Sequence, residues 1–344
     1  MKTTSQRTLT LTAIVLANLL FAARSQADPL ANEVAKFDQQ PLSTTAVAGQ
    51  IYFGHDELST AYGVGNAASP PLNYQGRFMA DDFADKVSTP VVHLSWWGSY
   101  INDTAPTPQA HVQKFLVAFE SDVPAGPGGF SQPGQVLDYD IVTLGGLTPG
   151  SGTFTESLVR GPDTISNEAL YKYNAELHLG HEFQEKADTV YWLKITALVD
   201  VPQPLPSPVP PGTTQWGWHD RDYTINDTLA STAPAVTPGE SIVGNLLGQN
   251  IYHFQDDAVQ GDLRFTPSAP PGQDIIQLGM TPQNYLFVNS VGAGPIDGPP
   301  GIQNFSKDLA FTLYTPKVPE PASCLLMTMG LAAIGSLRRR PSTR

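Results

Sequence analysis

Glycine and proline are placed along this chain in a way that disfavours long helices. The 344 residues include 30 glycines and 31 prolines, together above the ordinary share of these two residue types. Both interrupt helices and favour turns. Between them lie short segments in which apolar side chains recur at every second position, the period of a strand with one buried face. The pattern predicts an all-β fold with long Gly/Pro-rich loops.

Four segments indicate how such strands would pack. Residues 91–97, 189–199 and 309–313 carry apolar side chains at alternate positions, so each has one face toward a core. Residues 114–120 (KFLVAFE) are apolar on both faces, which is typical of a central strand covered on both sides. These strands predict a jelly-roll-like β-sandwich. Helical periodicity is weak, and a short helix is expected only within residues 165–179.

One segment raises the question of a domain boundary. Residues 201–212 (VPQPLPSPVPPG) contain six prolines and are expected to be extended and stiff. We interpret them as a long loop between strands rather than a linker, because strand-like sequence continues on both sides. A single β-sandwich domain is therefore expected over residues 28–317.

The first 27 residues have the pattern of a secretory signal peptide. A basic start precedes an apolar run from Leu9 to Ala23, and Ser25-Gln26-Ala27 places small residues at the cleavage positions. Cleavage is expected after Ala27. A buried N-terminal helix is the alternative interpretation.

Residues 318–344 form a segment of three parts. These are Val318-Pro319-Glu320-Pro321, an uncharged stretch from Cys324 to Leu337, and the cluster Arg338, Arg339 and Arg340. The uncharged stretch is shorter than the ~20 residues that cross a bilayer comfortably. The arginines favour the cytoplasmic side and would halt export. The pattern predicts a short hydrophobic helix inserted transiently in the membrane, with an ordinary membrane anchor as the alternative.

This three-part tail resembles the PEP-CTERM sorting signal. The resemblance implies recognition by an exosortase, a transpeptidase-like membrane enzyme, and removal of the tail near its Pro-Glu-Pro motif. It also implies an exported protein that reaches the cell surface or the extracellular matrix of a Gram-negative bacterium that makes exopolysaccharide.

Charge and cysteine content limit the classes of ligand and of stabilising site that the sequence predicts. The chain has a net charge of −13, and cleavage after Ala27 and after Pro321 would leave 12 basic and 32 acidic residues, a net charge of −20. Such a balance argues against nucleic-acid binding and fits cations or neutral sugars as ligands. The single cysteine, Cys324, lies in the tail, so the mature region forms no internal disulfide and no cysteine-based zinc site.

Several phrases follow one another along the mature region. They are ADDF from Ala80, WWGS from Trp96, SDVPAGPGGFSQPG from Ser121, YWL from Tyr191, QWGW from Gln215, DDAV from Asp256 and DLAFTLYT from Asp308. Their order resembles an uncharacterised domain that is common in secreted bacterial PEP-CTERM proteins, over roughly Tyr52 to Thr315. The resemblance implies a β-sandwich-type domain and supplies no catalytic residues.

Two aspartate pairs are candidate calcium ligands. Asp81-Asp82 and Asp256-Asp257 adjoin aromatic residues at expected strand ends. Calcium takes six to eight oxygen ligands, and the chain has no contiguous calcium-binding loop, so such a site would be assembled across loops. The alternative is that these carboxylates accept hydrogen bonds from nearby backbone N–H groups.

Trp97, Trp216 and Trp218 are candidate sugar-binding residues because an exposed aromatic ring can stack on a sugar. Packing in the core is the competing interpretation. No catalytic residue emerges: the chain lacks a G-x-S-x-G motif, and its many acids do not identify a hydrolytic pair. The histidines of residues 178–182 (HLGHE) are metal-ligating in type, but the glycine between them works against a helix that would align them.

Together these observations predict an exported, non-enzymatic protein of the cell surface or extracellular matrix. Its role would be structural or adhesive, with extracellular polysaccharide as a candidate partner and no required cofactor, although calcium is a candidate ligand. The alternative is a carbohydrate-binding module or a carbohydrate-active enzyme that acts on extracellular polysaccharide.

Overall fold

A computed structural model describes most of the mature region. The described residues are 30–41, 56–64, 73–101, 110–127, 129–162, 169–222, 225–230, 240–243, 250–253, 258–285, 305–306 and 308–317. The expected signal peptide and the expected C-terminal hydrophobic helix lie outside them. Among the residues that the structure describes, no helix has the length and apolar character needed to cross a membrane.

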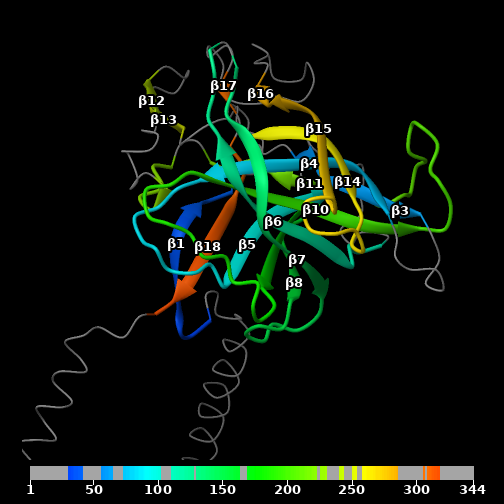
Figure 1. Ribbon diagram of the computed structural model, residues 1–344, viewed down its shortest axis with the longest axis horizontal. Coiled ribbons are helices and arrows are strands. Elements are labelled where there is room, and N and C mark those ends of the chain that lie inside the picture. The colour runs from blue at the N-terminus through cyan, green and yellow to red at the C-terminus, as the bar shows by residue number, and fades with distance from the viewer. Residues whose placement is uncertain are drawn as a thin grey trace, which may run out of the picture.

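The described fold is built from strands (Figure 1). They are β1 (Glu33–Gln39), β2 (Asp56–Leu58), β3 (Thr60–Val64), β4 (Tyr74–Phe83), β5 (His93–Tyr100), β6 (Lys114–Val123), β7 (Gln132–Leu144), β8 (Thr153–Arg160), β9 (Leu170–Glu176), β10 (Tyr191–Val201), β11 (Trp216–His219), β12 (Glu240–Val243), β13 (Asn250–His253), β14 (Val259–Phe265), β15 (Ile275–Pro282), β16 (Asn284–Tyr285), β17 (Phe305–Ser306) and β18 (Phe311–Pro316). The all-β prediction is confirmed.

One large sheet turns back on itself. Its strand order is β1-β18-β5-β9-β8-β7-β6-β10-β3-β4-β14-β15, and β11 pairs with both β2 and β5. Paired strands run from β5 through β9, β8, β7, β6 and β10 to β3. Ser59 joins β3 to β2 along the chain, and β2 pairs with β11, which pairs with β5 and so closes the circuit. This closed circuit faces the two halves of the sheet toward each other, as the layers of a sandwich do.

Aromatic side chains fill the space between the two halves. Phe115 of β6 has Trp96, Phe154, Tyr173 and Trp216 around it, with ring centroids 4.8–5.2 Å away in every case, and all five rings are buried. Such large rings contribute much of the apolar area that a core removes from water. We call the cluster that contains these rings the first core.

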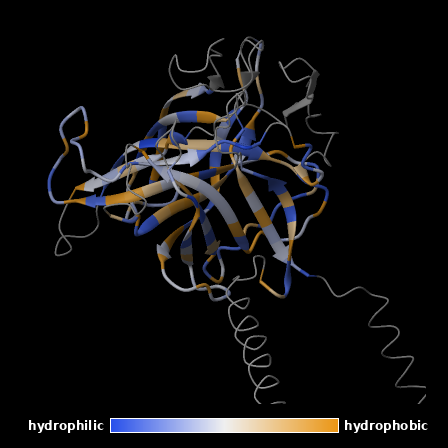
Figure 2. Cartoon of the chain, turned by 180° about the vertical axis from the view of Figure 1, so that it is seen from behind, coloured by the Kyte–Doolittle hydropathy of each residue, from blue (hydrophilic) through white to orange (hydrophobic). Residues whose placement is uncertain are grey.

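A second core covers the opposite face of β4, β6 and β10. Leu116 and Ala118 of β6 belong to it, whereas Phe115, Val117 and Phe119 belong to the first core. The prediction that residues 114–120 form a strand covered on both sides is therefore confirmed. Figure 2 shows hydrophilic and hydrophobic residues following one another along other strands of the sheet.

The expected short helix within residues 165–179 is wrong for the part that the structure describes. Residues Leu170–Glu176 form strand β9. Tyr171, Tyr173 and Ala175 point into the first core at every second position, and β9 pairs on its two edges with β5 and β8. Pairing on both edges outweighs the local sequence signal, because each strand satisfies the other's backbone groups.

Candidate functional site

A groove lies between strands β3 and β4 and the proline-rich loop that joins β10 to β11. Its volume is about 630 Å³. One wall comes from the strands and combines the polar residues Thr60, Tyr62, Asn73, Gln75 and Arg77 with Leu58 and Val64, and Gln215 at the end of the loop adds a further polar side chain. The other wall comes from the loop and is mostly apolar, with Pro204, Leu205, Pro206 and Val209. In Figure 1 this loop extends away from the body of the protein beyond β3.

The groove continues the inner face of the sheet beyond the end of the first core. Ala61 of β3 packs into the second core, so its neighbours Thr60 and Tyr62 face the other way, toward the groove. Across the strand pair, Gln75 of β4 lies opposite Tyr62. Gly76 lets the two strands approach, because a Cβ atom there would lie 2.1 Å from the carbonyl oxygen of Thr60.

Tyr62 also holds the proline-rich loop against the sheet. Its hydroxyl donates a hydrogen bond to the carbonyl oxygen of Thr214, 3.2 Å away. Burial raises the pKa of Tyr62 to about 12, and a hydrogen bond with Gln215 opposes this rise. The phenol therefore remains protonated, and able to donate, throughout the physiological range. This contact and the stiffness of the proline-rich loop together favour a preformed groove.

The polar side chains of the groove suit ligands that carry hydroxyl groups. The side-chain amides of Asn73, Gln75 and Gln215 offer both donors and acceptors. Arg77 pairs with Asp262 at 2.9 Å on the exposed surface, where such a pair is worth little to stability. The described lining of the groove includes no carboxylate. The arrangement can therefore orient a polar, uncharged chain by hydrogen bonds.

The structure describes one of the two candidate calcium-binding pairs, Asp81 and Asp82. Asp81 and Asp82 are consecutive in β4, so their side chains leave opposite faces of the strand, and both are buried. Asp256 and Asp257 lie outside the described residues. Asp81 accepts hydrogen bonds from the backbone N–H of Leu309 at 2.7 Å and of Asp82 at 3.1 Å. These contacts are those of the alternative interpretation, in which Asp81 accepts hydrogen bonds from backbone N–H groups.

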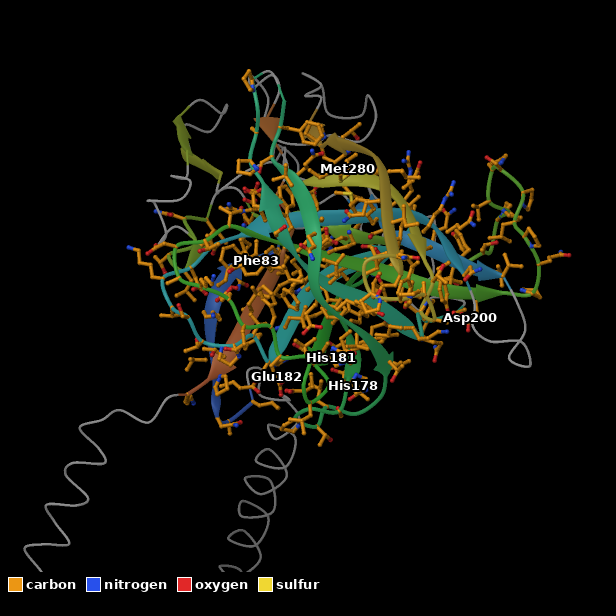
Figure 3. All side chains as sticks on the ribbon, viewed as in Figure 1. Phe83, His178, His181, Glu182, Asp200 and Met280 are labelled. Atoms are coloured by element: carbon orange, nitrogen blue, oxygen red, sulfur yellow. The ribbon has the colours of Figure 1, made fainter. Side chains whose placement is uncertain are left out.

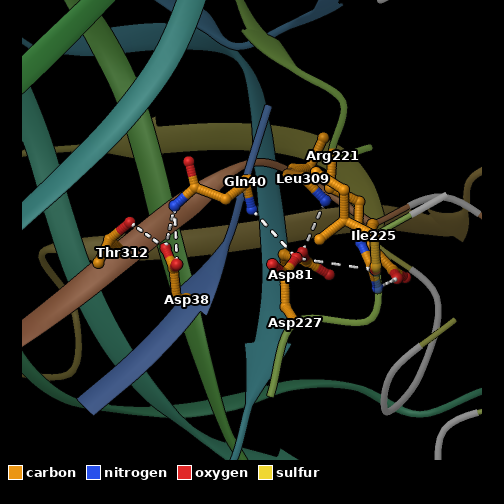
Figure 4. A network of polar contacts seen from close by, with 9 residues as sticks. Asp38, Gln40, Asp81, Arg221, Ile225, Asp227, Leu309 and Thr312 are labelled. Carbon is orange, nitrogen blue, oxygen red and sulfur yellow. Dashed lines mark hydrogen bonds and ion pairs between the residues drawn. The ribbon is translucent and has the colours of Figure 1, made fainter. Parts of the chain in front are cut away.

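A buried arginine organises the surroundings of Asp81 (Figure 4). The Arg221 guanidinium donates to Asp308 at 3.0 Å and to the carbonyl oxygen of Ile225 at 3.0 Å, and it lies 3.9 Å from Asp227. Burial, and then the charge of Asp308, raises the pKa of Asp81 well above its usual range, although Arg221 opposes the rise. The Arg221 guanidinium is the cation around which the described part of this network is arranged.

Two buried lysines play a similar part elsewhere. Lys36 forms ion pairs with Asp85, at 3.3 Å, and with Glu185. Lys194 of β10 pairs with Glu120 of β6 on the face of the second core. Burial lowers the pKa of Lys194, and Glu120 opposes this. The chain thus supplies its own cations to these buried carboxylates. No local sequence signal marks either lysine as internal, because its partner comes from another strand or loop.

The three candidate sugar-binding tryptophans are buried. Trp216 and Trp218 have no exposed surface, and Trp97 is 5% exposed with the ammonium of Lys172 5.0 Å from its ring centre. Trp218 donates its indole N–H to the carbonyl oxygen of Ala310, 2.9 Å away. Packing, the competing interpretation, describes all three: Trp216 and Trp218 lie in the first core, and Trp97 packs with Leu170 and Ala310 on the other face of β5.

The histidines of residues 178–182 lie together at one end of the protein (Figure 3). Their Nδ1 atoms contact carboxylates of β7: His178 meets Asp140 at 2.7 Å and His181 meets Asp138 at 3.1 Å. The pKa of His181 is raised, chiefly by its bond with Asp138. The centres of the two rings are 6.5 Å apart and their planes make an angle of 72°, in a turn rather than a helix. Their contacts are those of two separate surface ion pairs.

The groove residues escaped the sequence-based search. Prediction of a stiff loop at residues 201–212 located one wall, but nothing in the sequence joined this loop to residues 60–62 or 73–77. A signal was present at Gly76, which interrupts a strand-like segment, because such glycines mark close approaches of backbone.

Comparison with known families gives two matches. A domain of unknown function (DUF7901) matches residues 35–245, more than half of the chain, and the PEP-CTERM protein-sorting motif matches residues 317–340. Strands β14, β15 and β18 lie beyond the first match and belong to the same sheet. No curated protein and no solved structure matches the chain. The chain therefore belongs to the DUF7901 family, and its PEP-CTERM motif indicates an exported protein that is sorted by an exosortase.

Proposed function

We propose that this protein has a structural or adhesive, non-enzymatic role at the cell surface or in the extracellular matrix, and that it binds neutral polysaccharide in the groove beside β3 and β4. The observation that carries the proposal is the composition of the groove. Three amides and a protonated phenol contribute to its lining, and a proline-rich segment forms one wall.

Three physical arguments support a neutral sugar polymer as the ligand. Sugar hydroxyls need paired donors and acceptors, which Gln75 and Gln215 supply. The net charge of −20 expected for the exported region disfavours anionic polymers over the protein as a whole. The groove is open and is bounded by a loop, as suits a polymer that runs past the site at both ends.

The same composition favours binding over hydrolysis. Glycoside hydrolysis uses two carboxyl groups that flank the scissile bond. Asp262 lies beside the groove but is already paired with Arg77, and the described lining provides no second carboxylate. No cofactor is needed for the proposed role.

The test is binding of purified host exopolysaccharide to the exported protein, measured by affinity electrophoresis together with release of new reducing ends. Gln75→Ala should weaken binding about tenfold, because loss of one or two hydrogen bonds is worth about 1.4 kcal/mol. Gln135→Ala is the matched control, since Gln135 is exposed on β7 outside the groove. Equal binding by both variants and wild type, or none by wild type, would refute the proposed site. Release of reducing ends would show an enzyme instead.

A further inference from the structure

A histidine and two glutamates meet where three strands end. His93 is the first residue of β5, Glu176 is the last residue of β9, and Glu33 is the first residue of β1. His93 and Glu176 are opposite each other in the pairing of β5 with β9. Their sequence neighbours Leu94 and Ala175 point into the first core, so both side chains lie on the other face of the sheet. This cluster shares no residue with the described lining of the groove.

The geometry of the cluster is compact. The Nδ1 atom of His93 is 2.8 Å from Oε2 of Glu33 and 3.8 Å from Oε1 of Glu176. One ligand atom from each of the three residues lies within 4.8 Å of the other two. All three residues are at most 3% exposed. Tyr314 of β18 stacks on the imidazole at 4.6 Å between ring centres, which fixes the plane of the ring.

The Nδ1 atom of His93 has a carboxylate oxygen of each glutamate within 4 Å. A divalent cation bound to the Nδ1 lone pair would interact with both carboxylates at once. Buried charges in proteins are paired with other charges or coordinate metals. We propose that Glu33, His93 and Glu176 bind a divalent transition metal, with zinc as the representative ion.

The donor set and the spacing favour zinc over calcium. Zinc accepts histidine nitrogen and glutamate oxygen at about 2.0–2.2 Å, and in tetrahedral geometry this places neighbouring ligand atoms ~3.4 Å apart. The two distances from Nδ1, 2.8 and 3.8 Å, lie on either side of that value. Small side-chain movements would bring the three atoms into position. Calcium prefers oxygen ligands and a larger number of them.

The site would connect the edge strand β1 to two strands with which it does not pair, β5 and β9. β1 is the last strand of the sheet and pairs with β18 alone in the strand order, whereas β5 and β9 are internal. A metal held by all three strands would fasten the edge strand to the interior. Because the unfolded chain does not hold these ligands together, binding energy becomes folding stability.

The experiment uses the full exported protein, stripped with chelator and shown to be folded by circular dichroism. Zinc is titrated by calorimetry, and cobalt is added as a spectroscopic probe of the coordination. We expect one zinc per chain and a higher unfolding temperature when zinc is bound. Glu176→Gln should weaken binding about 100-fold or more, since even indirect support of a metal ligand is worth 10–100-fold. Glu33→Gln, on the edge strand, provides a second test with less risk to folding.

Two control variants separate this site from other histidines. His219 is equally buried and has one carboxylate, Asp56, at 2.9 Å from its Nδ1, so His219→Gln removes a comparable pair but should keep zinc binding. His178→Asn removes a surface histidine and should also keep it. The proposal is overturned if folded wild type binds no zinc. It is equally overturned if binding survives both glutamate substitutions, or is lost with His178→Asn.

Discussion

Raising the pH from 7 to 8.5 is expected to destabilise this protein through one buried carboxyl group. Lys36 donates to the carbonyl oxygen of Thr89 and forms ion pairs with both Asp85 and Glu185, and the three charged side chains are at most 2% exposed. One ammonium between two carboxylates leaves a buried negative charge unless one carboxyl is protonated. Burial, and then Asp85, raises the pKa of Glu185 to about 9, against the lowering effect of Lys36.

The sign and size of the effect follow from the protons bound. The folded protein keeps the Glu185 proton up to about pH 9, whereas the unfolded chain releases it near its ordinary value of 4.5. The stabilising contribution is therefore complete below the ordinary value and is lost as the pH rises through the folded value. Each pH unit within this window lowers the free energy of unfolding by about 1.4 kcal/mol. From pH 7 to pH 8.5 the expected loss is about 2 kcal/mol.

Urea unfolding of the exported protein at pH 7, 7.75 and 8.5 measures this loss. Asp227 has a pKa raised to about 7 and contributes mainly below the window. Glu185→Gln should remove most of the slope, because the amide has no proton to lose. Glu182→Gln, three residues away and partly exposed, should keep the wild-type slope. A wild-type stability that is constant or rises over this range, or an unchanged slope in Glu185→Gln, would refute the reasoning.

Three further outcomes are expected from the packing. Lys194→Met should cost about 3–5 kcal/mol in denaturant unfolding by leaving Glu120 buried without its cation, and adding Glu120→Gln should recover most of the loss. Gly76→Ala should lower stability by about 1–3 kcal/mol in the same assay, because its Cβ would meet the Thr60 carbonyl oxygen. Trp216→Ala should cost about 3–5 kcal/mol by opening a cavity in the first core, and unchanged stability would contradict its placement there.

The sequence was sufficient to predict features that depend on residues close together in the chain. Alternation along residues 189–199 predicted which side chains of β10 face the first core, and Tyr191, Leu193, Ile195 and Ala197 do so. The sorting motif at residues 317–340 was recognised from its linear order alone, because such a signal is read as a short segment. The proline content of residues 201–212 predicted the long loop between β10 and β11.

Relations between distant segments were decided only by the tertiary structure. Nothing local indicated that β11 would close the circuit by pairing with β2 and β5, which is what buries Trp216 and Trp218. His93 and Glu33 are 60 residues apart in the chain, yet they touch at one edge of the sheet. Alternation assigns a side chain to a face of its own strand. Which strand lies beside it depends on pairing between distant segments, and that choice minimises unpaired backbone groups over the whole sheet.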